Sequence, residues 1–176
     1  TLACSIVSSP GLAAIAERSG LTHIETLTGF KWISRAPNLV FGFEEALGYL
    51  VDPEVLRDKD GISAALDILT LCAELKAKGT TLADNASDFA SRLGAFSSSQ
   101  ISLRVTDLPE IPRIMNRLRA APPTQIGGVA VDHIDDFEHG FGGFPPGDIL
   151  RIWMADGARI VVRPSGTEPK LKVYID

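Results

Sequence analysis

The feature that most constrains the fold is a change of hydrophobic pattern at the polar stretch Phe96-Ser97-Ser98-Ser99. Before it, short strand-like runs alternate with segments of helical spacing, and after it most of the chain is short β-like runs. The chain has 176 residues, 45 % of them apolar, which is enough for two small domains. The sequence therefore predicts a mixed α/β domain over residues 1–96, followed by a small α+β domain over residues 97–176.

The start of the first domain predicts a strand, a helix and two further strands. LACSIVSS has the composition of a buried strand. Ser9 and Pro10 suit the start of the helix that follows, and Gly20 suits its end. HIETLTGF and NLVFGFEE are β-like runs.

The rest of the first domain predicts two helices. Asp60 is placed to cap a long helix that ends at Gly79, and TTLADNASDFASRLG is a second, weaker amphipathic segment. The apolar residues of the long helix cover most of its surface, so we expect it to be packed on two sides.

The second domain predicts an antiparallel sheet with one helix packed on it. ISLRVTDL alternates as a half-buried strand does, and Pro109 opens a short helix that runs to Arg119. GGVAVDHIDDF, DILRIWMA, ARIVVR and KLKVYID are later strand candidates. Asp156-Gly157 is a strong hairpin signal between two of them. Together these elements are typical of an α+β layer.

The bulk composition excludes some function classes. The formal net charge is −5, which argues against a nucleic-acid or membrane-surface partner. No apolar run approaches about 20 residues, and the first residues lack a signal-peptide pattern. Cys4 and Cys72 lack CxxC spacing, so we expect two free thiols and a cytoplasmic protein. Both chain ends fall in β-like runs, so we expect a piece of a longer protein, with the second domain cut short at its C-terminus.

The loop RPSGTEPK carries the clearest chemical signal. Arg163 can donate to two oxygens of a phosphate at once, and Ser165 and Thr167 add hydroxyl donors. Gly166 would let backbone N–H groups turn toward an anion, and Lys170 adds positive charge. The alternative is a solvated polar turn that binds nothing. The residue types alone leave both interpretations open, because arginine and serine are also common in ordinary turns.

Three stretches of the chain resemble the α-D-phosphohexomutases, a family that includes phosphoglucomutases and phosphomannomutases. RPSGTEPKLKVYID is similar to the phosphate-binding loop of the last domain of that family. FGFEEALGYLVDPEVLRDKDG resembles the sugar-recognition loop of the third domain and the lysine segment after it, and TLTGFKW is a third match. The stretches occur in family order, so the whole chain resembles the third and fourth domains.

The resemblance implies a role for each matching residue. The loop at Arg163 would hold the non-transferring phosphate of the sugar, and Glu44 would accept hydrogen bonds from adjacent ring hydroxyls. The TLTGF loop would approach the sugar, Lys59 would face a phosphate or phosphoserine, and Lys31 is a weaker candidate of that kind. The implied substrate-binding residues are Thr28, Gly29, Glu44, Lys59, Arg163, Ser165, Gly166, Thr167 and Lys170.

The resemblance also implies chemistry for which this sequence lacks the residues. In the family, a phosphoserine donates its phosphoryl group to a sugar monophosphate, through a bisphosphorylated sugar and with Mg²⁺. Neither the catalytic serine motif nor the aspartate-rich magnesium loop is found here, so we assign both to N-terminal domains that this sequence lacks. We therefore expect no catalytic residue and no metal ligand in this part, which would recognise the phosphosugar and be inactive alone.

Several alternatives stay open at this point. Many family members have a serine where this chain has Ala46, and FEEA is typical of a phosphoglucomutase or phosphopentomutase-like branch, so the sugar is not fixed. The chain could also be a non-catalytic phosphosugar-binding module, or an α/β structure whose polar loop binds nothing. Taken without the resemblance, Glu44-Glu45 is typical of a helix start and Lys59 of a solvated charge cluster.

Overall fold

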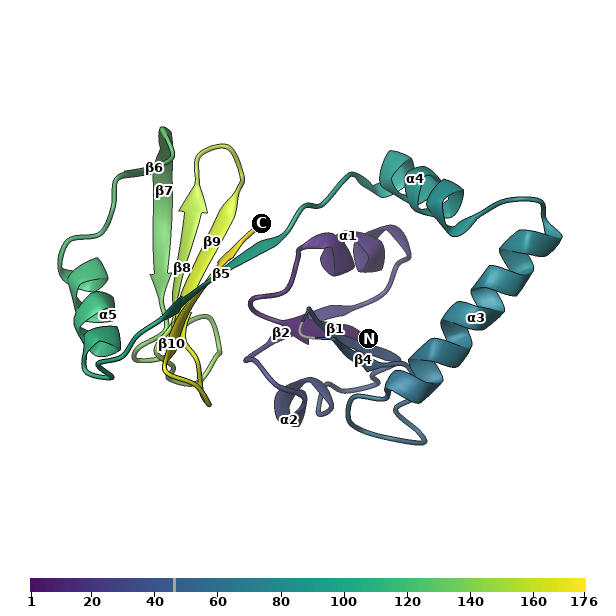
Figure 1. Ribbon diagram of the computed structural model, residues 1–176, viewed down its shortest axis with the longest axis horizontal. Helices are drawn as coiled ribbons and strands as arrows, with labels where there is room; N and C mark the ends of the chain where they lie inside the picture. The colour runs from purple at the N-terminus through teal and green to yellow at the C-terminus, as the bar shows by residue number, and fades with distance from the viewer. Residues whose placement is uncertain (46) are drawn as a thin grey trace. The chain divides into compact units, whose positions relative to one another are not determined.

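The computed structural model describes residues 1–45 and 47–176. The chain divides into two compact units, Thr1–Ser97 and Ser98–Asp176, each of which is described by itself. The first has a mixed sheet with helices, and the second has an antiparallel sheet with one helix (Figure 1). The predicted fold class is therefore confirmed.

The first unit is built on a four-stranded sheet in the order β2-β1-β3-β4. β1 (Leu2–Ser5) lies between β2 (His23–Thr26) and β3 (Phe41–Glu44), and both pairings are parallel. β4 (Gly48–Leu50) turns back antiparallel to β3. β4 is not among the strands expected from the sequence, because its three residues give too short a run for an alternation signal.

Two helices cover opposite faces of this sheet. Side chains alternate along a strand, so successive residues of β1 point to opposite faces. The cluster under α1 (Gly11–Arg18) contains Leu2, Cys4, Leu12 and Ala16. The cluster under α2 (Phe30–Ile33) contains Ala3, Phe30, Ile33, Ala36, Leu39 and Leu50. The β-like run HIETLTGF is therefore strand only as far as Thr26, and the apolar Phe30 at its end belongs to a helix.

The long helix α3 (Gly61–Ala77) begins as predicted, with the Asp60 carboxylate accepting from the N–H groups of Ile62 and Ser63. It does not pack on two sides, and that prediction is wrong. Leu75 is its only buried side chain among the described residues, whereas Leu66 is 60 % exposed. Helical spacing shows which side chains are apolar, but it does not show what covers them.

The exposure of α3 predicts that two leucines of one helix respond differently to the same change. Leu66→Gln should alter the free energy of unfolding of the first unit by no more than about 0.5 kcal/mol. Leu75→Gln should cost about 2 kcal/mol or more, because it places an amide in a buried apolar site. Urea unfolding of both variants checks this, and equal losses would contradict the exposed position of Leu66.

Helix α4 (Leu82–Leu93) follows α3 and starts at a capping box. The Thr81 hydroxyl accepts from the Asp84 N–H at 3.1 Å, and the Asp84 carboxylate accepts from the Thr81 N–H at 3.0 Å. None of the helices in the two described ranges is both long and apolar enough to cross a membrane.

The second unit is a six-stranded antiparallel sheet in the order β5-β10-β9-β8-β7-β6. Its strands are β5 (Ser99–Arg104), β6 (Gln125–Ile126), β7 (Val129–Asp136), β8 (Leu150–Met154), β9 (Arg159–Pro164) and β10 (Lys170–Ile175). The hairpin predicted at Asp156-Gly157 joins β8 to β9, with Gly157 at a φ of 90°.

One face of this sheet is covered by α5 (Glu110–Ala120), whose buried residues are Ile111 and Met115. Leu171 and Val162 pack in the same core cluster, so they point toward α5. By alternation, the neighbours of Leu171 point to the opposite face. That opposite face holds the polar residues of β10.

Candidate functional site

In the first unit, the candidate residues gather where the parallel strands end. β1, β2 and β3 run in one direction, so their carboxyl ends lie at the same edge of the sheet. The helices that follow β1 and β2 cover opposite faces, which makes this edge a topological switch point, the usual place for a ligand in an open α/β sheet. Thr28 and Gly29 follow β2, and Glu44 ends β3.

A hydrogen bond joins these two loops. The Gly29 N–H donates to Oε2 of Glu44 at 3.2 Å, and Gly29 has a φ of 104°, which favours glycine at this position. A carboxylate has about four acceptor positions, so Glu44 keeps capacity for a ligand. Thr28, which precedes Gly29 in the chain, is half-buried. Ala46 lies outside the described residues.

The interpretation of Glu44-Glu45 as a helix-start pair is wrong. Glu44 belongs to β3, and Glu45 follows in the turn that leads to β4. The Glu45 carboxylate accepts from the Ser9 N–H at 2.6 Å, so it holds the loop after β1. Both glutamates therefore accept from backbone N–H groups of other loops at the carboxyl edge of the sheet.

Lys59 lies near the same edge through its contact with Phe30. Its Nζ is 4.8 Å from the centre of the Phe30 ring, which follows Gly29 in the chain. The same Nζ is 3.4 Å from Oδ1 of Asp58, and the backbone N–H and the ammonium of Lys59 hold the pKa of that carboxyl below its ordinary value. Lys59 therefore belongs to a charge pair as well as to this edge. Lys31, the weaker candidate, lies with its Nζ 5.6 Å from the Trp32 ring centre.

Gly48 is a residue of this site that the sequence does not suggest. It lies directly opposite Glu44 in the β3–β4 pairing. A Cβ at this position would come within 2.5 Å of a Phe30 ring carbon and 2.6 Å of Cγ of Glu44. Glycine is therefore required for Glu44 to keep its place beside Phe30. Its signal in the sequence, one glycine four residues after a glutamate, is too common to be recognised.

In the second unit, the candidate loop connects β9 to β10. Arg163 lies near the end of β9 and Lys170 begins β10, and both are half-buried. The Ser165 N–H donates to the Lys170 carbonyl at 2.8 Å, which closes the loop. Thr167 is exposed at its tip. Gly166 has open space around its Cβ position and no positive φ, so this conformation does not require glycine there.

The register of the sheet gathers positive charge beside this loop. Arg163 is paired with Lys172, and Arg104 of β5 is paired with Lys170. Paired residues on neighbouring strands point to the same face, so these four cations share the face turned away from α5. Within residues 1–45 and 47–176, Arg163 and Lys172 form no ion pair. The arrangement can therefore bind an anion such as a phosphate.

One carboxylate lies among these cations. Oε1 of Glu168 is 2.7 Å from Nζ of Lys170 and 3.6 Å from the Arg104 guanidinium. The hydrogen bond from Lys170 holds the pKa of Glu168 below its ordinary value, although burial acts in the opposite direction. The group is therefore ionised at neutral pH.

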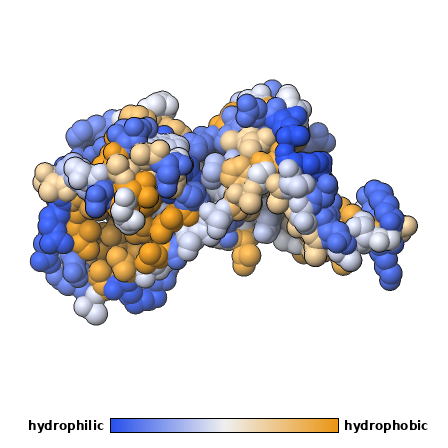
Figure 2. Space-filling view, turned by 90° about the horizontal axis from the view of Figure 1, so that it is seen from above, coloured by the Kyte–Doolittle hydropathy of each residue, from blue (hydrophilic) through white to orange (hydrophobic). Residues whose placement is uncertain are grey.

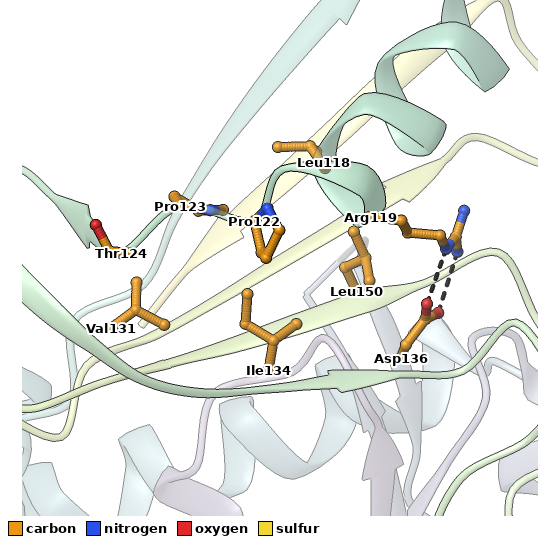
Figure 3. A pocket seen from close by; sticks show the side chains of 9 residues that line it. All are labelled: Leu118, Arg119, Pro122, Pro123, Thr124, Val131, Ile134, Asp136 and Leu150. Atoms are coloured by element: carbon orange, nitrogen blue, oxygen red, sulfur yellow. Dashed lines mark hydrogen bonds and ion pairs between the residues drawn. The ribbon is translucent and has the colours of Figure 1, made fainter.

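A separate hollow of the second unit does not suit an anion. A cavity of about 430 Å³ lies between the end of α5 and strands β7 and β8, and apolar residues gather around a hollow on the left-hand body in Figure 2. The Arg119 guanidinium lies at its edge and points at Asp136, as Figure 3 shows. Arg119 donates to Asp136 at 2.9 Å and to Asp148 at 2.8 Å, so carboxylates of the protein already occupy its donors. The apolar residues that line the cavity are Leu118, Pro122, Pro123, Val131, Ile134 and Leu150.

The Arg119–Asp136 pair predicts a pH dependence of stability. Burial raises the pKa of Asp136, but the hydrogen bonds from Arg119 and the Glu138 N–H outweigh it, so the pKa is lowered overall. The stabilisation is therefore complete above the ordinary value of about 3.9 and is lost as the pH falls through the lowered value of the folded protein. Asp136→Asn should flatten this loss in urea unfolding between about pH 5 and pH 2, followed by amide signals of the second unit. An unchanged slope would contradict the role of the pair.

No metal centre can be built from the residues that the structure describes. Among residues 1–45 and 47–176, no group of three or more His, Cys, Asp or Glu side chains is arranged to hold an ion. A divalent ion prefers several oxygen ligands around one point, and this part of the chain does not fit that requirement.

Comparisons with known proteins agree with the observed fold. The profile of "Phosphoglucomutase/phosphomannomutase, alpha/beta/alpha domain III" matches residues 1–92. The profile of the "Phosphoglucomutase/phosphomannomutase, C-terminal domain" matches residues 101–176. These matches confirm the resemblance to the third and fourth domains.

Individual relatives agree with the profiles. A probable phosphomannomutase of Haemophilus influenzae is 53 % identical over 180 residues, which cover 100 % of this chain and 36 % of that protein. A phosphoglucomutase of Staphylococcus epidermidis is 34 % identical over 192 residues, which cover 97 % of this chain and 35 % of that protein. The chain thus spans about a third of the length of these curated relatives.

A solved structure shows the same fold. The open form of pp63/parafusin from Paramecium, an exocytosis-sensitive phosphoprotein described as a phosphoglucomutase, superposes with a TM-score of 0.69 at 24 % identity. The superposition covers 99 % of this chain and 32 % of that one. Because the domain III profile alone accounts for residues 1–92 of 176, the chain belongs to the phosphoglucomutase/phosphomannomutase family.

Proposed function

We propose that this chain is the substrate-recognition part of a mutase that interconverts sugar 1-phosphates and sugar 6-phosphates. The observation that carries the proposal is the cationic face beside the β9–β10 loop, where Arg163 forms no ion pair within residues 1–45 and 47–176. The relatives are phosphomannomutases and phosphoglucomutases by name, which supports a phosphosugar as the ligand.

The second unit takes the phosphate that is not transferred. The planar guanidinium of Arg163 donates to two phosphate oxygens, and Ser165 and Thr167 donate from their hydroxyls. The backbone N–H of Gly166 adds a further donor, and Lys170 adds charge from the start of β10. Rigid backbone contacts of the loop reduce the entropy that binding costs.

The first unit recognises the hydroxyl groups of the sugar. Glu44 accepts from two adjacent hydroxyls, and its contact with the Gly29 N–H keeps the carboxylate in place while the ligand changes. Thr28 and Gly29 border the sugar, and Lys59 faces its other phosphate. A sugar that reverses end for end offers different hydroxyls, and a carboxylate with several acceptor positions accommodates both orientations.

The transfer step belongs to the rest of the proposed enzyme. A phosphoserine, Mg²⁺ and a bisphosphorylated sugar intermediate are parts of the proposal, and we assign the serine and the metal ligands to domains outside this sequence. Those domains are the expected partners of this chain. We also propose a cytoplasmic location, since Cys4 and Cys72 are free thiols.

The test uses the complete natural protein and this chain side by side. The complete protein should convert glucose 1-phosphate, mannose 1-phosphate or a pentose 1-phosphate to the matching sugar phosphate, and the panel identifies the sugar. This chain should bind the best substrate weakly in calorimetry and turn none over. A complete protein that binds a phosphosugar but converts none of the panel would contradict the mutase and favour a binding module.

A further inference from the structure

Glu168 is a carboxylate in the loop that the proposed function assigns to phosphate. It lies beside two cations of the site, with one oxygen, Oε1, shared by Lys170 at 2.7 Å and Arg104 at 3.6 Å. A carboxylate at this place repels a phosphate, and it also occupies the Lys170 ammonium, which would otherwise attract the phosphate. Its presence therefore needs an explanation that anion binding alone does not give.

The side chain of Glu168 does not hold the loop together. The loop is closed by backbone hydrogen bonds from Ser165 to Lys170, from Lys170 to Glu168 and from Val105 to Pro169. Glu168 contributes its carbonyl to this network, and any residue has a carbonyl. Its side chain is 42 % exposed, and within the described ranges it forms ion pairs with Lys170 and Arg104 alone.

We propose that Glu168 sets the affinity of the site as an internal competitor, which occupies Lys170 while the site is empty and must be displaced when phosphate binds. The inference rests on the proposed function. Arg104 receives the displaced carboxylate, because the same oxygen already lies within ionic reach of both cations. Exchange between two cations lowers the affinity of the loop without changing its shape.

A carboxylate that competes for Lys170 suits a ligand that must be released and bound again. A mutase that reverses its bisphosphorylated intermediate has to release one phosphate from this loop and then bind the other. A site with four unopposed cations would hold a phosphate dianion longer than such a cycle permits. One internal carboxylate reduces that attraction and keeps the contact reversible.

The first test measures the affinity of the complete natural protein for inorganic phosphate and for a hexose 1-phosphate. Glu168→Gln should bind both about fivefold more tightly at low salt, with a smaller gain at high salt, since exposed charges are screened. Glu110→Gln is the matched control, because it removes one acidic group from the first turn of α5 in the same unit. The control should change the affinity less than twofold, and the melting temperatures of both variants should match the wild type.

The results separate this inference from the proposed function. If Arg163→Ala abolishes binding and Glu168→Gln binds no better than the wild type, Glu168 is no competitor and only the inference is overturned. If Arg163→Ala binds as well as the wild type, the loop is not the phosphate site and the proposed function fails. An equal gain in Glu110→Gln would assign the effect to net charge and overturn the inference as well.

A second test asks whether Arg104 affects phosphate binding only by pairing with Glu168. Arg104→Gln should weaken phosphate binding about threefold in the wild type, because the carboxylate then remains on Lys170. In the Glu168→Gln background the same change should have little effect. An equal loss in both backgrounds would show that Arg104 contacts the phosphate itself, which overturns its role as the alternative partner of Glu168.

Discussion

Arg163→Ala should weaken the binding of a hexose 1-phosphate about a hundredfold, with little change in the stability of the second unit. The guanidinium is expected to make two charge-assisted hydrogen bonds to the phosphate, and their loss is worth about 3 kcal/mol. The side chain is half-buried at the end of β9 and forms no ion pair within residues 1–45 and 47–176, so its removal leaves no carboxylate unpaired. Calorimetry with wild type and variant measures the ratio directly.

Two further variants show whether the effect depends on geometry or on charge. Arg163→Lys keeps the charge but cannot donate two parallel hydrogen bonds, so it should recover only part of the affinity. Arg117→Ala removes an arginine from α5 in the same unit and should bind almost as the wild type does. If Arg117→Ala weakened binding as much as Arg163→Ala, the β9–β10 loop would not be the phosphate site.

Gly48→Ala should destabilise the first unit by about 1–3 kcal/mol and also weaken the proposed contact of this unit with the sugar. The added methyl group would lie 2.5 Å from a Phe30 ring carbon and 2.6 Å from Cγ of Glu44. Phe30 is 3 % exposed in a packed core, so the ring has little room to move and Glu44 has to shift. The hydrogen bond from Gly29 to Glu44 should then break, which nuclear magnetic resonance of the Gly29 amide would report.

Gly61→Ala is the matched control for this prediction. A Cβ at Gly61 meets nothing within 4 Å, and the residue begins α3, where alanine is a better helix former than glycine. Gly61→Ala should therefore be neutral or slightly stabilising. Urea unfolding compares the two variants, and equal stabilities would show that Gly48 is not required for the packing around Glu44.

Local chemistry is enough to place several elements from the sequence. The Asp60 cap of α3 and the Asp156-Gly157 hairpin depend on residues within a few positions of each other, and both are present in the structure. Elements that depend on distant packing are predicted less well. Helix α2 has only four residues and directly follows a β-like run, so no helical spacing predicts it. The apolar residues of α3 can be recognised in the sequence, but the sequence does not show whether other residues cover them.

The candidate site shows the same limit. The loop from Arg163 to Lys170 is one continuous segment, so its composition alone raises the hypothesis of an anion site, which stays a prediction. The contacts of Glu44 are of another kind, because Gly29 lies in the loop between β2 and α2 and Gly48 lies in β4, and the order of the sheet brings both to Glu44. Arg104 is likewise paired with Lys170 only because β5 pairs with β10. The two residues are too far apart in the sequence for this pairing to be predicted from local patterns.

The position of β10 has a consequence for how the second unit forms. β10 follows the other strands of the unit in the chain, yet it lies between β5, the earliest, and β9. Ser99 is paired with Ile175, so this contact closes nearly the entire unit and cannot form early during synthesis. A nascent chain that still lacks β10 should leave β5 without a neighbour and attract chaperones. The proposed anion site beside the β9–β10 loop would then form only after β10 has emerged from the ribosome.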